Sequence, residues 1–153
     1  MTVLPYRERL EEIVRILEAQ GSLGLLLVDG SDLSRVEHDY GTAAYQTVLR
    51  QASQIVGDLQ GTDFRTTDIL TTNDRAGDAF LIFLSPRRYG SSVRLGDLRT
   101  RANRIEQSLN RRFAALTSPY LRGRPKVAVG YALVPYNRLI RSEERRVGKE
   151  CRL

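Results

Sequence analysis

The stretch LGLLLVDG, residues 23–30, decides the fold of this chain, because its apolar residues follow one another instead of alternating with polar ones. Such a run is typical of a central β-strand that is covered on both faces of its sheet. It is far too short to cross a bilayer, which takes about 20 apolar residues. The stretch therefore predicts a buried strand that ends at Asp29, with Gly30 opening a turn.

Amphipathic helices are expected on both sides of this strand. Apolar side chains recur at helical spacing over residues 4–20, which end at Gly21, and again over 32–59, with a break at 39–41. Residues 93–116 show the same spacing. The sequence thus predicts helical segments that each offer one apolar face to a core.

Two further strands and a hairpin are expected. The segment AFLIFL, residues 79–84, is separated from Ile69 and Leu70 by a polar turn over 73–78, an order that predicts a β-hairpin. The segment KVAVGYALV, residues 126–134, predicts the last strand. Strands that alternate with helices in this way indicate an α/β sandwich with a mixed sheet.

Length and composition exclude several classes of protein. The 153 residues suit one domain, and 41% hydrophobic and 27% charged residues are typical of a folded soluble protein. A single cysteine and a single histidine exclude a disulfide framework and a zinc module. The net charge is +6, but a chain without Trp and with 7% aromatic residues is not expected to bind nucleic acid. Because no signal peptide or membrane-spanning run is present, we expect a cytoplasmic protein with no membrane partner.

The C-terminal segment, residues 141–153, differs from the rest of the chain. It has the sequence RSEERRVGKECRL, which contains the only cysteine and shows no sustained apolar periodicity. Within it, SEERRVGKECR resembles a translated assembly artefact. We therefore expect a tail that is not native to the domain, with a natural basic tail as the alternative.

Two acidic residues lie where a sheet could place metal ligands. Asp29 ends the first strand, and Asp78 lies in the turn before residues 79–84. Carboxylates at neighbouring strand ends can share a hard cation such as Mg²⁺, which takes oxygen ligands and the phosphates of a substrate. Acidic residues also flank strands without any function, so on these grounds alone two solvated turn residues are the alternative.

The residues around both aspartates resemble a known family. The segment LLLVDGSDLSRVEHDYGTAAYQ, residues 25–46, resembles the opening of the GGDEF, or diguanylate cyclase, family, and its spacing from Asp29 to Gly41 matches without a gap. The family's signature hairpin, Gly-Gly-Asp/Glu-Glu-Phe, is matched by AGDAF at residues 76–80. The segment VAVGYALVP, residues 127–135, is similar to a later strand of the family that contains Ser-x-Gly.

The resemblance implies a nucleotidyl-cyclase-like fold, an α/β domain with a mixed central sheet flanked by helices. This degenerate GGDEF domain would occupy residues 22–140, preceded by a helix within residues 1–21. The family continues with a further helix where residues 141–153 stand, so the domain would be truncated at its C-terminal end.

The resemblance also implies ligands and partners. Active family members join two GTP molecules into cyclic di-GMP across a homodimer, with metal ions between acidic side chains and the triphosphates. The implied cofactor is Mg²⁺, and the implied partners are GTP or cyclic di-GMP, together with a second copy or an attached signalling domain. The residues that the resemblance assigns to the metal are Asp29, Gly30 and Asp78. Those that it assigns to the nucleotide are Glu37, Gln46 and Gly77.

Several positions depart from the family pattern and bear on catalysis. Ala79 replaces the second signature acid, and Ala76 replaces a glycine that lets the backbone approach the phosphates without a Cβ in the way. Glu37 stands where the family has a guanine-reading Asn, and Gln46 stands where it has a base-reading Asp. Glu37 could still accept hydrogen bonds from guanine, but it cannot donate one to O6. No catalytic residue set at positions 76–80 is therefore expected to be intact.

A further motif resembles the family's site for product inhibition, Arg-x-x-Asp placed five residues before the signature. Arg65 and Asp68 have the required spacing, but seven residues, 69–75, separate them from the signature. A shift of two residues along a strand preserves the face but moves the site by about 7 Å. An inhibitory cyclic di-GMP site at these two residues is one expectation, and an exposed pair on an edge strand is the other.

Three functional hypotheses follow from these patterns. The leading one is a degenerate GGDEF domain of a bacterial cyclic di-GMP signalling protein, catalytically inactive and regulatory, which senses nucleotide or dimerises. The first alternative is a weakly active diguanylate cyclase that converts two GTP to cyclic di-GMP through Asp29 and Asp78. The second is a structural interaction domain that binds no nucleotide.

Overall fold

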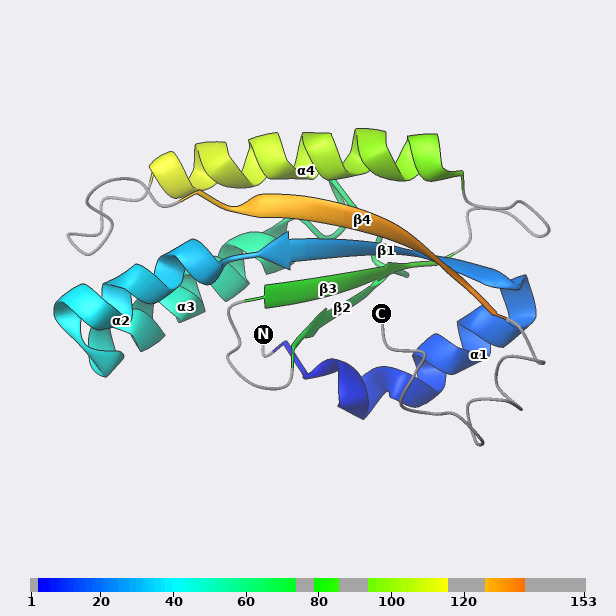
Figure 1. Ribbon diagram of the computed structural model, residues 1–153, viewed down its shortest axis with the longest axis horizontal. Helices are drawn as coiled ribbons and strands as arrows, with labels where there is room; N and C mark the ends of the chain where they lie inside the picture. The colour runs from blue at the N-terminus through cyan, green and yellow to red at the C-terminus, as the bar shows by residue number, and fades with distance from the viewer. Residues whose placement is uncertain (1–2, 74–78, 86–93, 116–125, 137–153) are drawn as a thin grey trace, which may run out of the picture.

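The computed structural model describes residues 3–73, 79–85, 94–115 and 126–136. Helices and strands follow one another along the chain, with α2 directly before α3 and β2 directly before β3, and Figure 1 shows their arrangement. The short 3-10 turns are η1 (Tyr6–Arg9) and η2 (Ser31–Leu33), and the helices are α1 (Leu10–Gln20), α2 (Ser34–Tyr40), α3 (Thr42–Asp58) and α4 (Leu95–Ala114). The strands are β1 (Ser22–Asp29), β2 (Ile69–Thr72), β3 (Ala79–Leu84) and β4 (Ala128–Pro135).

The described strands form one sheet in the order β2-β3-β1-β4, with every neighbouring pair antiparallel. The α/β architecture with a central sheet flanked by helices is confirmed, but the prediction of a mixed sheet is wrong for these strands. The physical reason is that each helical crossover joins strands that are not neighbours. The β2–β3 hairpin returns β3 between β1 and β2, and β1 in turn lies between β3 and β4, so no two of these four strands pair in parallel. An isolated parallel bridge joins Pro5 to Thr72 of β2.

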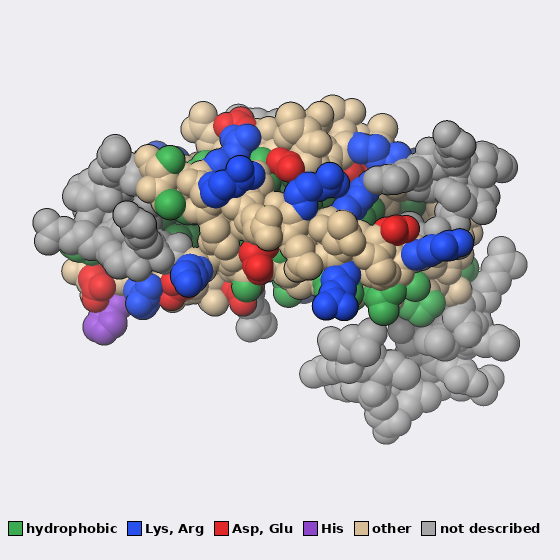
Figure 2. Space-filling view, turned by 90° about the horizontal axis from the view of Figure 1, so that it is seen from above, with side chains coloured by type: hydrophobic (Ala, Val, Ile, Leu, Met, Phe, Trp, Pro, Cys, Tyr) green, Lys and Arg blue, Asp and Glu red, His purple; other side chains and the backbone are tan. Residues whose placement is uncertain are grey.

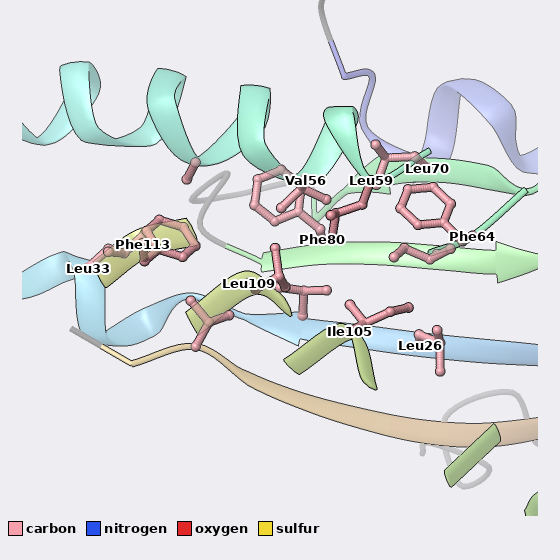
Figure 3. Close-up of a cluster of buried hydrophobic side chains, with 14 of the residues drawn as sticks. Leu26, Leu33, Val56, Leu59, Phe64, Leu70, Phe80, Ile105, Leu109 and Phe113 are labelled. Carbon is pink, nitrogen blue, oxygen red and sulfur yellow. The ribbon is translucent and has the colours of Figure 1, made fainter. Parts of the chain in front are cut away.

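The two faces of the sheet carry separate apolar clusters. On one face, side chains of β1 and β3 pack against α3 and α4, as the close-up in Figure 3 shows for Leu26, Phe80 and Ile105. On the other face, Ile13 of α1 packs with Phe83 and neighbouring residues. Because residues in a strand alternate between faces, burial on both sides explains the apolar run of β1 as far as Leu26. Leu27, on the face that also contacts α1, is 40% exposed.

Two glycines set the ends of helices. Gly21 has φ +77° and closes α1, with its N–H bonded to the carbonyl of Leu17 at 2.9 Å. Gly41 has φ +96° and ψ 174° and separates α2 from α3. The interruption predicted at 39–41 is confirmed, because only glycine adopts this conformation without strain.

The remaining expectations about the chain stand as follows. The hairpin is confirmed as β2 and β3. No helix among the described residues is both long and apolar enough to cross a membrane. The tail over 141–153 lies outside the described residues.

Candidate functional site

Asp29 lies at the end of the central strand, in register with two small residues. The β-ladders pair Asp29 with Ala79 of β3 on one side and with Ala128 of β4 on the other. Directly opposed residues of an antiparallel pair point to the same face, with Cβ atoms about 5 Å apart. A carboxylate flanked by two methyl groups therefore lies on the face of the sheet that also contacts α1.

The carboxylate of Asp29 is exposed and only partly used by the protein. Its Oδ1 accepts a hydrogen bond from the backbone N–H of Ser31 at 2.9 Å, a local turn that fixes the side chain. Among the described residues, the other oxygen has no hydrogen-bond partner. Gly30, the next residue, is buried and makes the turn from β1 to η2 through its carbonyl, which accepts from Leu33 N.

The signature segment is described only in part. Ala76, Gly77 and Asp78 lie outside the described residues, whereas Ala79 and Phe80 begin β3. Phe80 is buried in the core between the sheet and the helices, and Ala79 faces Asp29 across the ladder. The register thus brings Ala79 to the end of β1. No group of three or more metal-binding side chains occurs in the described part of the chain.

The two positions assigned to the base lie on the helices that follow β1. Glu37 is an exposed residue of α2, and Gln46 is an exposed residue of α3. Figure 1 shows α2 beyond the arrowhead of β1, at the same end of the sheet as Asp29, and α3 begins near that end and runs back behind the sheet. Leu33 and Val36 anchor this region in the core, so the exposed side chains are held on a fixed framework.

Asp32 has a role that the sequence patterns did not reveal. Its carboxylate accepts the backbone N–H of Lys126 at 3.0 Å and forms an ion pair with Arg35 at 3.0 Å. The contact joins the start of α2 to the residues that lead into β4, far along the chain. A lone acidic residue near a helix start gives no signal of such a partner, so sequence reasoning could not have found it.

The carboxylate of Asp68 is a buried structural acceptor. The side chain is fully covered, and it accepts hydrogen bonds from Arg65 N at 2.7 Å, Ser85 N at 2.8 Å and Ser85 Oγ at 3.0 Å. The guanidinium of Arg65 donates to the carbonyl of Ser85 and lies 3.9 Å from Asp68. These contacts tie the loop before β2 to the end of β3.

The expectation of an exposed Arg and Asp on an edge strand is therefore wrong for Asp68, which is 2% exposed, and both residues precede β2. Three donors stabilise the carboxylate in the interior, where a charge without partners would be costly. Ser85 follows the end of β3, whereas Ala79 begins that strand, so the two sites lie about 20 Å apart along it.

The arginines of α4 are distributed along a solvent-exposed face. Figure 2 views this side of the molecule and shows basic side chains separated by acidic and uncharged ones. The exposed arginines of the helix are Arg99, Arg104, Arg111 and Arg112. Such spacing is typical of a solvated helix face.

Neither a protein-family model nor a curated protein matches this sequence. Solved structures do match the fold. The diguanylate cyclase SiaD from Pseudomonas aeruginosa, in complex with its activator SiaC, has a TM-score of 0.61 at 16% identity, over 93% of this chain and 51% of that one. The active GGEEF domain of a diguanylate cyclase from Vibrio cholerae has a TM-score of 0.56 at 14% identity, over 97% and 88%. The GGDEF domain of YfiN from Pseudomonas aeruginosa has a TM-score of 0.56 at 22% identity, over 87% and 78%.

A further match is a microbial GGDEF domain solved with cyclic di-GMP, with a TM-score of 0.50 at 20% identity, over 96% of this chain and 84% of that one. All these identities are below 25%, so the matches show the fold alone. This chain also spans about half the length of the SiaD chain, 51%. The chain has the fold of a GGDEF domain.

Proposed function

We propose that this chain is a regulatory GGDEF-like domain of a cyclic di-GMP signalling protein, which binds a guanine nucleotide with Mg²⁺ but does not convert it to cyclic di-GMP. The observation that carries the proposal is the pairing of Asp29 with Ala79 across the β1–β3 ladder. One partner keeps a carboxylate, and the other, at the position of the second signature acid, has only a methyl group.

The retained half of the site supports nucleotide binding. Asp29 presents an exposed carboxylate with one oxygen that no described residue uses, and its conformation is fixed by Ser31. Mg²⁺ takes carboxylate oxygens together with substrate phosphates, so this donor suits it. When bound, the ion would neutralise phosphate charge. Asp78 directly precedes Ala79, and we assign it as the second carboxylate.

The missing half of the site argues against turnover. A methyl group at Ala79 can neither accept a proton nor hold a metal, and it faces Asp29 directly. Loss of one electrostatic stabiliser typically lowers a rate by about 10²–10³. Glu37 and Gln46 are both exposed on α2 and α3, where they can contact a base, but Glu37 offers acceptors only. Glu37 would thus bind guanine less selectively than the Asn that the family has at this position.

The Arg65 and Asp68 pair gives little support to an inhibitory site. Both oxygens of Asp68 already accept hydrogen bonds from the protein, and the residue is buried. A cyclic dinucleotide would have to displace this network. We therefore assign regulation to the Asp29 end of the sheet. We propose that a protein partner distinguishes the nucleotide-bound domain from the free one. This partner would be an attached signalling domain or an activator such as the one bound to SiaD.

Product analysis with a restoring variant tests the proposal. The protein is incubated with GTP and Mg²⁺ and the nucleotides are separated by chromatography; we expect no cyclic di-GMP. The double variant Ala76→Gly with Ala79→Glu restores the two signature residues and is expected to produce some. Ala128→Glu, which places a carboxylate on the other side of Asp29, is the matched control and should not. Turnover by the unchanged protein would instead favour the weakly active cyclase.

A further inference from the structure

Lys126 lies close to Asp29 at the end of the sheet. β4 begins beside the arrowhead of β1 in Figure 1, where the ladder pairs Ala128 with Asp29. Lys126 is two residues before Ala128, so its Cα lies about 8 Å from that of Asp29, one strand spacing across and two residues along. The lysine is therefore a neighbour of the carboxylate that we assign to Mg²⁺.

Alternation along β4 places this lysine on the same face of the sheet as Asp29. Val127 is buried in the apolar cluster that contacts α3 and α4, and Val129 packs against that cluster. Ala128 lies between them and points to the other face, opposite Asp29. Lys126 precedes Val127, so its side chain belongs to that same face, and it is exposed. A ligand held by Asp29 would meet it.

Hydrogen bonds from two other elements fix the backbone at this point. Asp32 of η2, which leads into α2, accepts the N–H of Lys126 at 3.0 Å. Asn110 of α4 accepts the N–H of Val127 at 3.0 Å and donates to its carbonyl at 3.1 Å. The backbone of the lysine is thus held in place before any ligand binds, which lowers the entropy that binding costs.

The charge of Lys126 is available to a ligand. The ion pairs among the described residues do not include its ammonium, whereas Arg35 is paired with Asp32 at 3.0 Å. A nucleoside triphosphate carries more negative charge than one Mg²⁺ neutralises, so a cation on the same face attracts it. Lysine binds phosphate as a compact point charge on a flexible stem.

We propose that Lys126 binds the phosphate chain of the nucleotide whose Mg²⁺ is held at Asp29. The inference rests on the proposed function and narrows its ligand to a nucleoside di- or triphosphate. Such a ligand contacts Mg²⁺ through one phosphate and the ammonium through another, whereas a monophosphate has a single group for both. The four-carbon stem of lysine lets the ammonium reach a phosphate next to the one that shares Mg²⁺ with Asp29.

Calorimetric titration with GTP and Mg²⁺ tests the role of the lysine. Lys126→Gln loses the charge but keeps the backbone N–H that Asp32 accepts, so this variant should fold normally. We expect it to bind GTP about tenfold more weakly than the parent at low salt. The difference should narrow in about 1 M NaCl, which screens charges. Lys126→Arg, which keeps the charge, should retain most of the affinity.

The matched control is Arg104→Gln, which removes the same charge from an exposed position of α4, on the other side of the sheet. This variant should bind GTP as the parent does. Equal affinities of the parent and of Lys126→Gln would overturn the inference and leave the proposed nucleotide binding standing. An equal loss in Lys126→Gln and Arg104→Gln would overturn it too, because the effect would then come from net charge alone.

Inorganic tripolyphosphate with Mg²⁺ separates this inference from the proposed function, because it has the phosphates without the base. We expect the parent to bind it, and Lys126→Gln to bind it about tenfold more weakly. Binding of tripolyphosphate that depends on Lys126, without binding of GTP, would support the phosphate contact and refute the nucleotide function. Absence of binding of both ligands by the parent would overturn both proposals.

Discussion

Replacing Asp68 by alanine should destabilise the protein strongly, because this carboxylate is the centre of a buried network. The substitution leaves two backbone donors, Arg65 N and Ser85 N, without an acceptor. The Ser85 hydroxyl also loses this acceptor and keeps only its contact with Thr67 Oγ1 at 2.8 Å. Each orphaned buried donor costs about 1–3 kcal/mol, and removal of one partner of a buried charged pair costs about 3–5 kcal/mol in all. We expect a loss of about 3–5 kcal/mol in the free energy of unfolding.

Equilibrium unfolding in urea measures this loss, with two variants for comparison. Asp68→Asn keeps the shape of the side chain, but its NH₂ group faces either Arg65 N or the two donors of Ser85 and cannot accept from them. The free energy of unfolding of this variant should therefore lie between those of the parent and of the alanine variant. Asp58→Ala removes an exposed aspartate at the end of α3 and should change stability by less than about 0.5 kcal/mol. A loss below about 1 kcal/mol for Asp68→Ala would refute the structural role and reopen these residues as a ligand site.

Other substitutions test separate parts of the structure. Gly41→Ala should lower the free energy of unfolding by about 1–3 kcal/mol, because alanine is strained at the φ of +96°. Gly57→Ala, inside α3, should be neutral or stabilising. An added Cβ meets no atom within 4 Å at either site, so the two substitutions differ in backbone conformation and not in crowding. Asn110→Ala should cost about 1–3 kcal/mol through the loss of both hydrogen bonds to Val127, which urea unfolding against Asn103→Ala would show. Ending the chain at Arg141 should change stability by less than about 0.5 kcal/mol. Millimolar Mg²⁺ should raise the thermal midpoint of the parent but not of Asp29→Asn.

The helices and strands were predictable because their signal is local. Apolar spacing located α1, α3 and α4, and the apolar run of residues 23–28 located the central strand. The order of the strands was not predictable from alternation alone, because it depends on where the hairpin inserts β3. That insertion makes every described ladder antiparallel, and it also pairs Asp29 with Ala79.

Several of the polar contacts depend on backbone groups that are remote in sequence. The acceptor for Lys126 N is Asp32, and the acceptors at the start of β4 come from α4. No spacing within a helix or strand encodes such partners. The burial of Asp68 was missed for the same reason, since Ser85 reaches it only after the hairpin has folded.

Calorimetric titration of GTP in the presence of Mg²⁺ tests the central claim, that the site still binds nucleotide although it has lost a catalytic acid. The account predicts saturable, Mg²⁺-dependent binding by the parent and by Asp58→Asn, whose exposed carboxylate lies at the end of α3. It predicts no binding by Asp29→Asn. Absence of binding by the parent, or unchanged binding by Asp29→Asn, would contradict the account and leave a domain that acts through protein contacts alone.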